Sequence, residues 1–168
     1  VKEFTPAKEV VFAYRLSPDN KEIGTAVRLD SGRTLITELG PKPRLREVNA
    51  DGSIAVDCPL QPETDNAHMQ TRMARKLANG NYLVPHLLAF AIKEYTPEGR
   101  VVSTLKTDLP ELGGRPAETW PFTAIRLPNG NTVFCNYLGH GHLGKQPHVF
   151  ELTPDKKVVY LSAERFLS

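Results

Sequence analysis

The chain has 168 residues, of which 40% are hydrophobic and 24% charged, and its net charge is +2. The charges are nearly balanced and form no long basic run, which argues against a nucleic-acid-binding surface. No apolar run approaches the roughly 18 residues that a membrane span needs. The two cysteines, Cys58 and Cys135, are too few for a disulfide framework, and we expect both to be small buried side chains that form no bridge.

Two sequence patterns alternate along the chain. The first pattern begins with a glutamate and occurs four times, starting at Glu3, Glu47, Glu94 and Glu151. The second surrounds a glycine-containing turn and occurs three times, at Leu29–Ile36, Leu77–Val84 and Leu127–Phe134. Each pattern is typical of a β-hairpin, because Gly and Pro set the backbone angles of tight turns between short apolar runs. Two hairpins in tandem give a unit of roughly 45–50 residues, the size of a β-propeller blade.

The elements follow in chain order, with the strands of a blade named A to D. Residues 1–16 predict strands C and D of an incomplete blade, at Val1–Phe4 and Val10–Tyr14. Residues 17–58 predict a blade with strands at Thr25–Leu29, Thr34–Glu38, Leu45–Val48 and Ser53–Cys58. Residues 59–107 predict a blade with strands at Met73–Leu77, Tyr82–His86, Ala91–Tyr95 and Val101–Leu105. Residues 108–168 predict a blade with strands at Thr123–Leu127, Thr132–Tyr137, His148–Leu152 and Val158–Ser162.

The predicted fold is therefore all-β: three complete four-stranded antiparallel blades after a leading half-blade, within one propeller domain. Three and a half blades do not close a ring of the usual four to eight, so we expect the chain to be part of a larger propeller. The remaining blades of the same propeller, or another chain, are the expected partners. The turn at Lys156 has lysine where the copies that start at Glu47 and Glu94 have glycine, and we expect Val to be tolerated better there than at Gly80 or Gly130.

The hairpin Leu127–Thr132, followed by Glu-Leu-Thr-Pro-Asp at Glu151–Asp155, resembles bacterial β-propeller proteins of the arylsulfotransferase-like and quinoprotein-like kind. Many members of this group are extracytoplasmic, so the resemblance favours a periplasmic or secreted location. Arylsulfotransferase-like enzymes use a catalytic histidine near the channel, and the resemblance assigns that position to His68. The quinoprotein blade motif ends in Trp, which the corresponding strands here lack, and this disfavours pyrroloquinoline quinone.

The long, variable B–C and D–A connections share one face of a propeller, and variable loops on a rigid scaffold are where binding residues gather. Imidazoles that converge can act as acid and base or bind a metal. The catalytic candidates on this face are His68, Arg72, His86 and His140. The candidate ligand-binding residues are Trp120, Arg115, His142 and Gln70. We predict no cofactor and no metal site, although His140 and His142 are an alternative for a divalent metal.

Strand A carries one cation in each complete blade, at Arg28, Lys76 and Arg126, two residues after an alanine. Either these cations form ion pairs between blades, or they make a positive channel that binds an anion. The leading functional hypothesis is a binding or scaffold protein that presents its loop face to a small molecule, a glycan or a protein. The alternative is a propeller enzyme, sulfotransferase-like or lyase- or hydrolase-like, acting on a polar or anionic substrate. A quinoprotein-like cofactor binder comes third.

Overall fold

The computed structural model describes residues 1–112, 119–139, 141 and 145–162. It is built from β-strands, and the described residues contain only two short 3₁₀ helices, η1 (Ala67–Met69) and η2 (Pro110–Leu112). The prediction of an all-β chain is confirmed. None of the helices in this part of the chain is long and apolar enough to cross a membrane.

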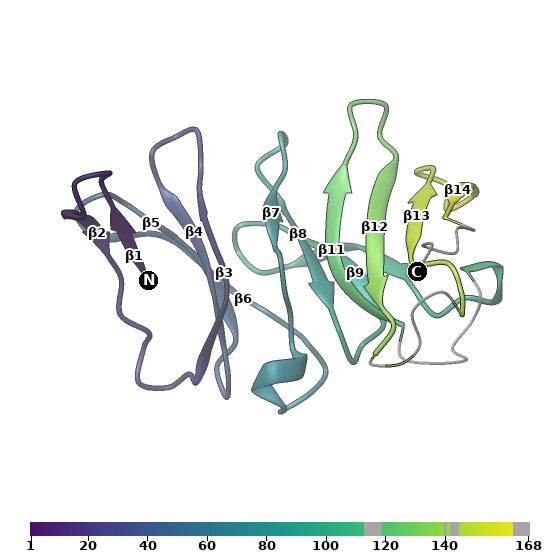
Figure 1. Ribbon diagram of the computed structural model, residues 1–168, viewed down its shortest axis with the longest axis horizontal. Coiled ribbons are helices and arrows are strands. Elements are labelled where there is room, and N and C mark those ends of the chain that lie inside the picture. Colours follow the sequence, from purple (N-terminus) through teal and green to yellow (C-terminus); the bar gives the residue numbers. More distant parts are fainter. Residues whose placement is uncertain (113–118, 140, 142–144, 163–168) are drawn as a thin grey trace.

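Four antiparallel sheets follow one another across the molecule, from the N-terminal end to the C-terminal end (Figure 1). The half-blade contains β1 (Lys2–Phe4) and β2 (Val10–Ala13). The first complete blade contains β3 (Glu22–Arg28), β4 (Thr34–Leu39), β5 (Arg44–Val48) and β6 (Ile54–Pro59). The second contains β7 (Arg75–Lys76), β8 (Tyr82–His86), β9 (Ala91–Tyr95) and β10 (Val101–Lys106). The third contains β11 (Trp120–Arg126), β12 (Thr132–Tyr137), β13 (Val149–Leu152) and β14 (Val158–Leu161).

Each complete blade is a meander in which neighbouring strands in sequence are also neighbours in the sheet. The A–B and C–D hairpin turns therefore lie on one face, here called the turn face, which is the upper edge of Figure 1. The B–C and D–A connections, including η1, lie on the opposite face, here called the loop face. This is the arrangement that the alternating hairpins predict.

The same hydrogen bond closes all three A–B turns. The amide of Leu29 donates to the carbonyl of Arg33 at 2.8 Å, and the equivalent bonds from Leu77 and Leu127 have the same length. The turn glycines have φ of +82° to +89° at Gly32, Gly80 and Gly130. A β-branched side chain does not fit this left-handed conformation, which is why glycine occurs in each copy.

The C–D turns share one backbone conformation, whether or not they contain glycine. Gly52 and Gly99 have positive φ, but so do the lysines at the same repeat position: φ is +65° at Lys8 and +67° at Lys156. The turn at Lys156 has therefore kept the left-handed conformation without the glycine that relieves it. Valine at this position would be strained too, but it would replace a lysine that already has this strain, so the expectation of better tolerance stays a prediction.

The second blade has a shorter strand A than predicted. The sequence predicts Met73–Leu77, whereas β7 has only two residues. Met73 has φ of +33°, which turns the chain out of the extended conformation before β7. The amide of Ala74 instead donates to Oγ1 of Thr25 in the preceding blade, at 2.9 Å. An isolated bridge between Thr71 and His86 continues the pairing toward the loop face.

The hydrophobic core lies between the blades. Between the first and second blades, Leu35, Leu45 and Cys58 pack with Ala74, Tyr82, Val84 and Tyr95. Between the second and third blades, Leu83 and Ile92 pack with Ala124, Phe134, Phe150 and Leu152. Each sheet therefore needs a neighbour on both faces to bury its apolar side chains, as expected for stacked blades.

A buried carboxylate anchors the connection between β2 and β3. Glu38, at the loop end of β4, is 0% exposed and accepts hydrogen bonds from the Tyr14 hydroxyl at 2.6 Å, the Ser17 amide at 2.8 Å and the Asn20 amide group at 2.9 Å. Burial by itself would raise the pKa of Glu38, but the hydrogen bonds from Ser17, Tyr14 and Asn20 lower it to about 2. Ionised Glu38 thus fixes the loop that leads into β3.

Candidate functional site

The three strand-A cations form ion pairs on the turn face. Arg28 pairs with Glu3, Lys76 pairs with Glu47, and Arg126 pairs with Glu94 at 3.2 Å. In each pair the glutamate belongs to strand C of the preceding blade and begins one copy of the first repeat pattern. Ion pairing between blades, one of the two interpretations of these cations, is therefore what the structure contains.

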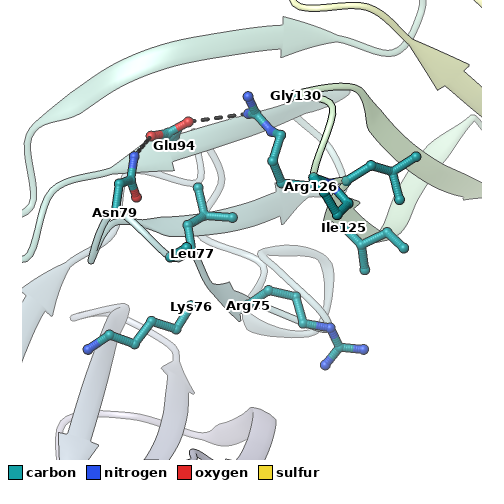
Figure 2. A pocket seen from close by; sticks show the side chains of 11 residues that line it. Arg75, Lys76, Leu77, Asn79, Glu94, Ile125, Arg126 and Gly130 are labelled. Carbon is teal, nitrogen blue, oxygen red and sulfur yellow. Dashed lines mark hydrogen bonds and ion pairs between the residues drawn. The ribbon is translucent and has the colours of Figure 1, made fainter.

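Further hydrogen bonds fix these glutamates. Glu94 accepts bonds from the amide groups of Asn79 at 3.1 Å and Asn81 at 2.8 Å, and Figure 2 shows it between Asn79 and Arg126. The side chain of Glu47 is fully buried and accepts a bond from the Tyr82 hydroxyl at 2.6 Å. Although burial would raise the pKa of Glu47, the bonds from Lys76, Tyr82 and Arg33 lower it.

A cavity of about 660 Å³ opens on the turn face between the second and third blades. Arg126 and Glu94 in its wall neutralise each other, and Leu77 and Ile125 supply apolar surface. Arg75 extends away from the Glu94–Arg126 pair in Figure 2. The cavity thus combines apolar strand and turn residues with charged side chains, most of which already form ion pairs between blades.

A smaller pocket of about 340 Å³ lies on the loop face between the same two blades. Its walls come from η1 and the segment after it, the end of β8, and the loop ends of β11 and β12. The lining residues are His68, Met69, Arg72, Leu87, Trp120, Phe122 and Tyr137. Three residues singled out from the sequence, His68, Arg72 and Trp120, therefore share one pocket, and this is the candidate site.

His68 and Arg72 form the polar wall of the pocket, and Glu22, which lies outside the lining, contacts both of them. Nδ1 of His68 lies 3.1 Å from Oε2 of Glu22 and 3.1 Å from Nη2 of Arg72. If Nδ1 carries the proton, it donates to Glu22 and leaves Nε2 as a base. If Nδ1 is unprotonated, it accepts from Arg72 and Nε2 becomes a donor. The imidazole, whose side chain is 72% exposed, can thus offer either kind of hydrogen bond.

Arg72 is held more tightly than His68. Its side chain is only 14% exposed, and Nη1 donates to the carbonyl of Thr71 at 2.7 Å. Burial lowers the pKa of Arg72, while the Glu22 carboxylate, 4.0 Å from Nη2, acts in the opposite direction. The guanidinium therefore supports the histidine and has its charge partly offset.

The apolar wall is aromatic. The rings of Trp120 and Tyr137 stack with centroids 5.9 Å apart and an interplanar angle of 28°. They face each other across paired strands, since Trp120 is the register partner of Tyr137. Phe122 remains 39% exposed, and Leu87 and Met69 complete the lining. Such a surface accepts the flat face of a ring or an apolar chain.

Two of the predicted site residues lie deep in the protein. His86 is 0% exposed, its Nε2 is 2.9 Å from the Tyr95 hydroxyl, and burial together with the Lys93 ammonium lowers its pKa to about 3. The Gln70 side chain donates to the carbonyl of Gly40 at 2.9 Å and accepts from the same residue's amide at 2.8 Å. Both residues tie elements together, and neither lines the pocket.

The other predicted site residues, Arg115, His140 and His142, lie outside the described residues. Within the described ranges, no group of three or more His, Cys, Asp or Glu side chains is placed to hold a metal ion. Cys58 and Cys135 are both free thiols, Cys58 buried and Cys135 half-buried.

Sequence reasoning missed Glu22 and Tyr137, although the repeat carries a signal for the first. Glu22, Gln70 and Trp120 all precede the strand-A cation of their blade by the same number of residues. This repeat position starts strand A at Glu22 and Trp120, which both contribute to the candidate site, and lies directly after η1 at Gln70. Tyr137 carried no separate signal, because its pairing with Trp120 depends on the register of β11 and β12.

The chain matches no family model and no curated protein, but several solved structures are similar to it. A protein of unknown function from Bacteroides caccae has a TM-score of 0.73 and 22% identity over 95% of this chain and 52% of that one. A streptogramin B lyase has a TM-score of 0.59 and 16% identity over 87% and 42%. Virginiamycin B lyase from Staphylococcus aureus has a TM-score of 0.62 and 9% identity over 98% and 48%.

The chain spans about half the length of these structures. At such identities the likeness shows the fold alone: the chain is part of a β-propeller. It does not extend to the arylsulfotransferase-like resemblance, which stays a prediction.

Proposed function

We propose that this protein is a propeller that binds a small ligand in the loop-face pocket. The ligand has a flat aromatic or apolar body that lies against Trp120 and Tyr137, and one polar group that hydrogen-bonds to His68. The observation that carries the proposal is that one pocket combines an aromatic pair with an imidazole held by Glu22 and Arg72.

The charges favour a polar group over a strongly anionic one. Nη1 of Arg72 donates to Thr71, Nη2 lies against His68, and Glu22 offsets part of the charge. The exposed group is His68, which can donate or accept. The volume of about 340 Å³ is at the small end of ligand pockets, so a single ring with one substituent fits the site.

The test uses Trp120, which is the only tryptophan of the chain, so intrinsic fluorescence reports on this pocket directly. Benzamide, benzoate and cyclohexanecarboxamide serve as probes, with calorimetry as a second readout. Tyr137→Leu should weaken benzamide binding about 2- to 10-fold, the range for an aromatic contact, and cyclohexanecarboxamide binding less. His68→Ala should weaken both amides about 2- to 10-fold through the lost hydrogen bond.

Asn129→Ala is the matched control, because it alters a turn on the opposite face. It should leave the affinity for all three probes unchanged. Probe binding that is equal in Tyr137→Leu, His68→Ala and the unaltered chain would contradict the proposal, as would a probe found on the Asn-Gly turns.

A second candidate function is a lyase-like enzyme in which His68 is the base. It is favoured by the 3.1 Å contact between Glu22 and Nδ1 of His68, which in one tautomer leaves Nε2 free to take a proton. The structural neighbours include a catalytically inactive form of virginiamycin B lyase with quinupristin. Quinupristin is therefore the first substrate to assay, by chromatography.

The enzyme candidate predicts turnover that is lost in His68→Ala and reduced in Glu22→Gln, with binding retained. Absence of turnover in the unaltered chain, together with normal binding of the amide probes, would leave ligand binding as the function.

A further inference from the structure

The third blade has one face that is only half-buried, although the equivalent face of the first and second blades is buried. Every residue of β4 and of β8 is buried, because both faces of these strands are covered by neighbouring blades. In β12 buried and half-buried residues alternate instead, and the same is true of β13. Three of the half-buried positions are the apolar residues Val133, Cys135 and Val149, whereas Tyr137, also half-buried, lines the loop-face pocket.

The repeat shows what these positions do elsewhere. Val133 corresponds to Leu83 of the second blade, and Val149 corresponds to Ile92. Leu83 and Ile92 are each only 2% exposed, because the third blade packs against them. The outer face of the third blade thus has the apolar surface of a blade interface without a neighbour among the described residues.

The same face carries the fourth repeat glutamate, Glu151. Its Oε1 accepts a bond from the Asn131 amide group at 2.7 Å, as Glu94 does from Asn81 at 2.8 Å. Glu94 is completed by Arg126 of the following blade. Within the described part of the chain, no cation pairs with Glu151. Glu151 is therefore the glutamate half of an ion pair of the kind that joins each of the three pairs of successive blades in the structure.

We propose that the outer face of the third blade, made of Val133, Cys135, Val149 and Glu151, binds a further propeller blade. The innermost strand of that blade carries an arginine or lysine two residues after an alanine, and Glu151 accepts this cation. The alanine lets the strands approach closely, as Ala124 does in the existing interface, where it is 1% exposed. Charge and apolar pattern together thus specify the occupant, whichever polypeptide supplies it.

A second copy of this chain does not meet these requirements. Its own strand-A cations, Arg28, Lys76 and Arg126, are already paired with glutamates of their preceding blades. Its half-blade consists of β1 and β2, which correspond to strands C and D, so it brings no strand A. A copy could cover apolar surface, but Glu151 would be left without its cation.

The test extends the chain by one blade. Residues 59–106 are copied and joined after Ser162 in place of residues 163–168, which keeps register because Cys58 and Ser162 occupy the same repeat position. The copied lysine corresponding to Lys76 then supplies the cation. The readout is the rate at which a thiol reagent modifies Cys135, which lies on the proposed interface. Cys58, 0% exposed, is the internal control.

In the extended chain we expect Cys135 to react at least about tenfold more slowly than in the original chain, because modification then requires the blade to detach. The rate at Cys58 should stay the same. Unchanged reactivity of Cys135 in an extended chain that is otherwise folded would overturn the proposal.

A double-mutant cycle tests the ion pair separately. In the extended chain, Glu151→Gln and methionine at the copied lysine should each raise the detachment equilibrium about fivefold, and the double variant no more than either alone. Glu151→Gln in the original chain should leave Cys135 reactivity unchanged. Additive effects of the two changes would refute the pairing. Protection of Cys135 that rises with the concentration of the original chain would assign the face to a second copy and refute the proposal.

Discussion

Gly99 allows a direct measurement of how closely two blades approach. It has φ of +85° in the C–D turn of the second blade, and a Cβ built there would lie 2.6 Å from both Cγ and Cδ of Pro59 in the first blade. Gly52 occupies the same turn position one blade earlier, with φ of +86° and nothing within 4 Å of its Cβ. Gly99→Ala and Gly52→Ala therefore introduce the same backbone strain, but only Gly99→Ala also introduces a clash between blades.

The magnitude follows from two contributions. A non-glycine residue in the left-handed region destabilises the folded state by about 1–2 kcal/mol. Alanine also lowers the conformational entropy of the unfolded chain, which offsets about 0.5–1 kcal/mol of this cost. Gly52→Ala should thus destabilise the protein by roughly 0.5–1 kcal/mol. Contact at 2.6 Å forces the two blades apart or distorts the turn, and overpacking of this kind costs about 1–3 kcal/mol more. Gly99→Ala should then cost about 1.5–4 kcal/mol.

Urea unfolding of the two single variants is the measurement, with Pro59→Ala as the rescue. In the background of Pro59→Ala, the change at Gly99 should approach the cost seen at Gly52, because the two clashing ring carbons are gone. Equal destabilisation at the two glycines in the unaltered background would show that the blades do not meet at Pro59, and the reasoning would be wrong.

Three further predictions concern stability. Because the pKa of Glu38 is about 2 when folded and near 4.5 when unfolded, its contribution is complete above pH 4.5 and is lost as the pH falls toward 2; Glu38→Gln should flatten acid unfolding in this range. His86 has a pKa of about 3 when folded, so the unfolded state takes up its proton first and stability falls from pH 6.5 down to 3. His86→Phe should remove that slope, most clearly between pH 6.5 and 5, where Glu38 does not titrate. Lys156→Gly should be neutral or raise the unfolding free energy by up to about 1 kcal/mol, since it relieves a lysine at φ +67°; a loss of stability in thermal unfolding would contradict this.

Strand positions were predictable where turn chemistry fixed both ends. Strands Tyr82–His86, Ala91–Tyr95 and Thr132–Tyr137 have the bounds expected from the sequence, because an Asn-Gly turn or a Thr-Pro turn fixes the register next to each. Strand β7 was predicted too long, because the positive φ of Met73 follows from no local signal and the chain there bonds to the side chain of Thr25 in another blade.

The ion pairs were half predictable. The repeat placed Arg28, Lys76 and Arg126 at one position and the glutamates at another, and interblade pairing was one of two open interpretations. Choosing between them needed the distance between strand A of one blade and strand C of the blade before it, which sequence periodicity does not give. Once three pairs are seen, the repeat alone assigns the fourth glutamate, Glu151, to the same role.

The candidate site lies where the repeat changes its chemistry. The repeat position six residues before the strand-A cation carries Glu22, Gln70 and Trp120 in successive blades. These are a carboxylate that contacts His68, an amide that binds the backbone of Gly40, and an aromatic wall. On the turn face the corresponding positions keep one chemistry, a cation against a glutamate, because the same contact between blades recurs. Positions that keep the same residue type in every blade therefore build the scaffold. A position whose residue type differs from blade to blade is not needed for the contact between blades and can contribute to binding. A ligand that contacts Trp120 and His68 would be recognised by residues that the repeat leaves free to vary, which is why the loop-face pocket is favoured over the larger cavity on the turn face.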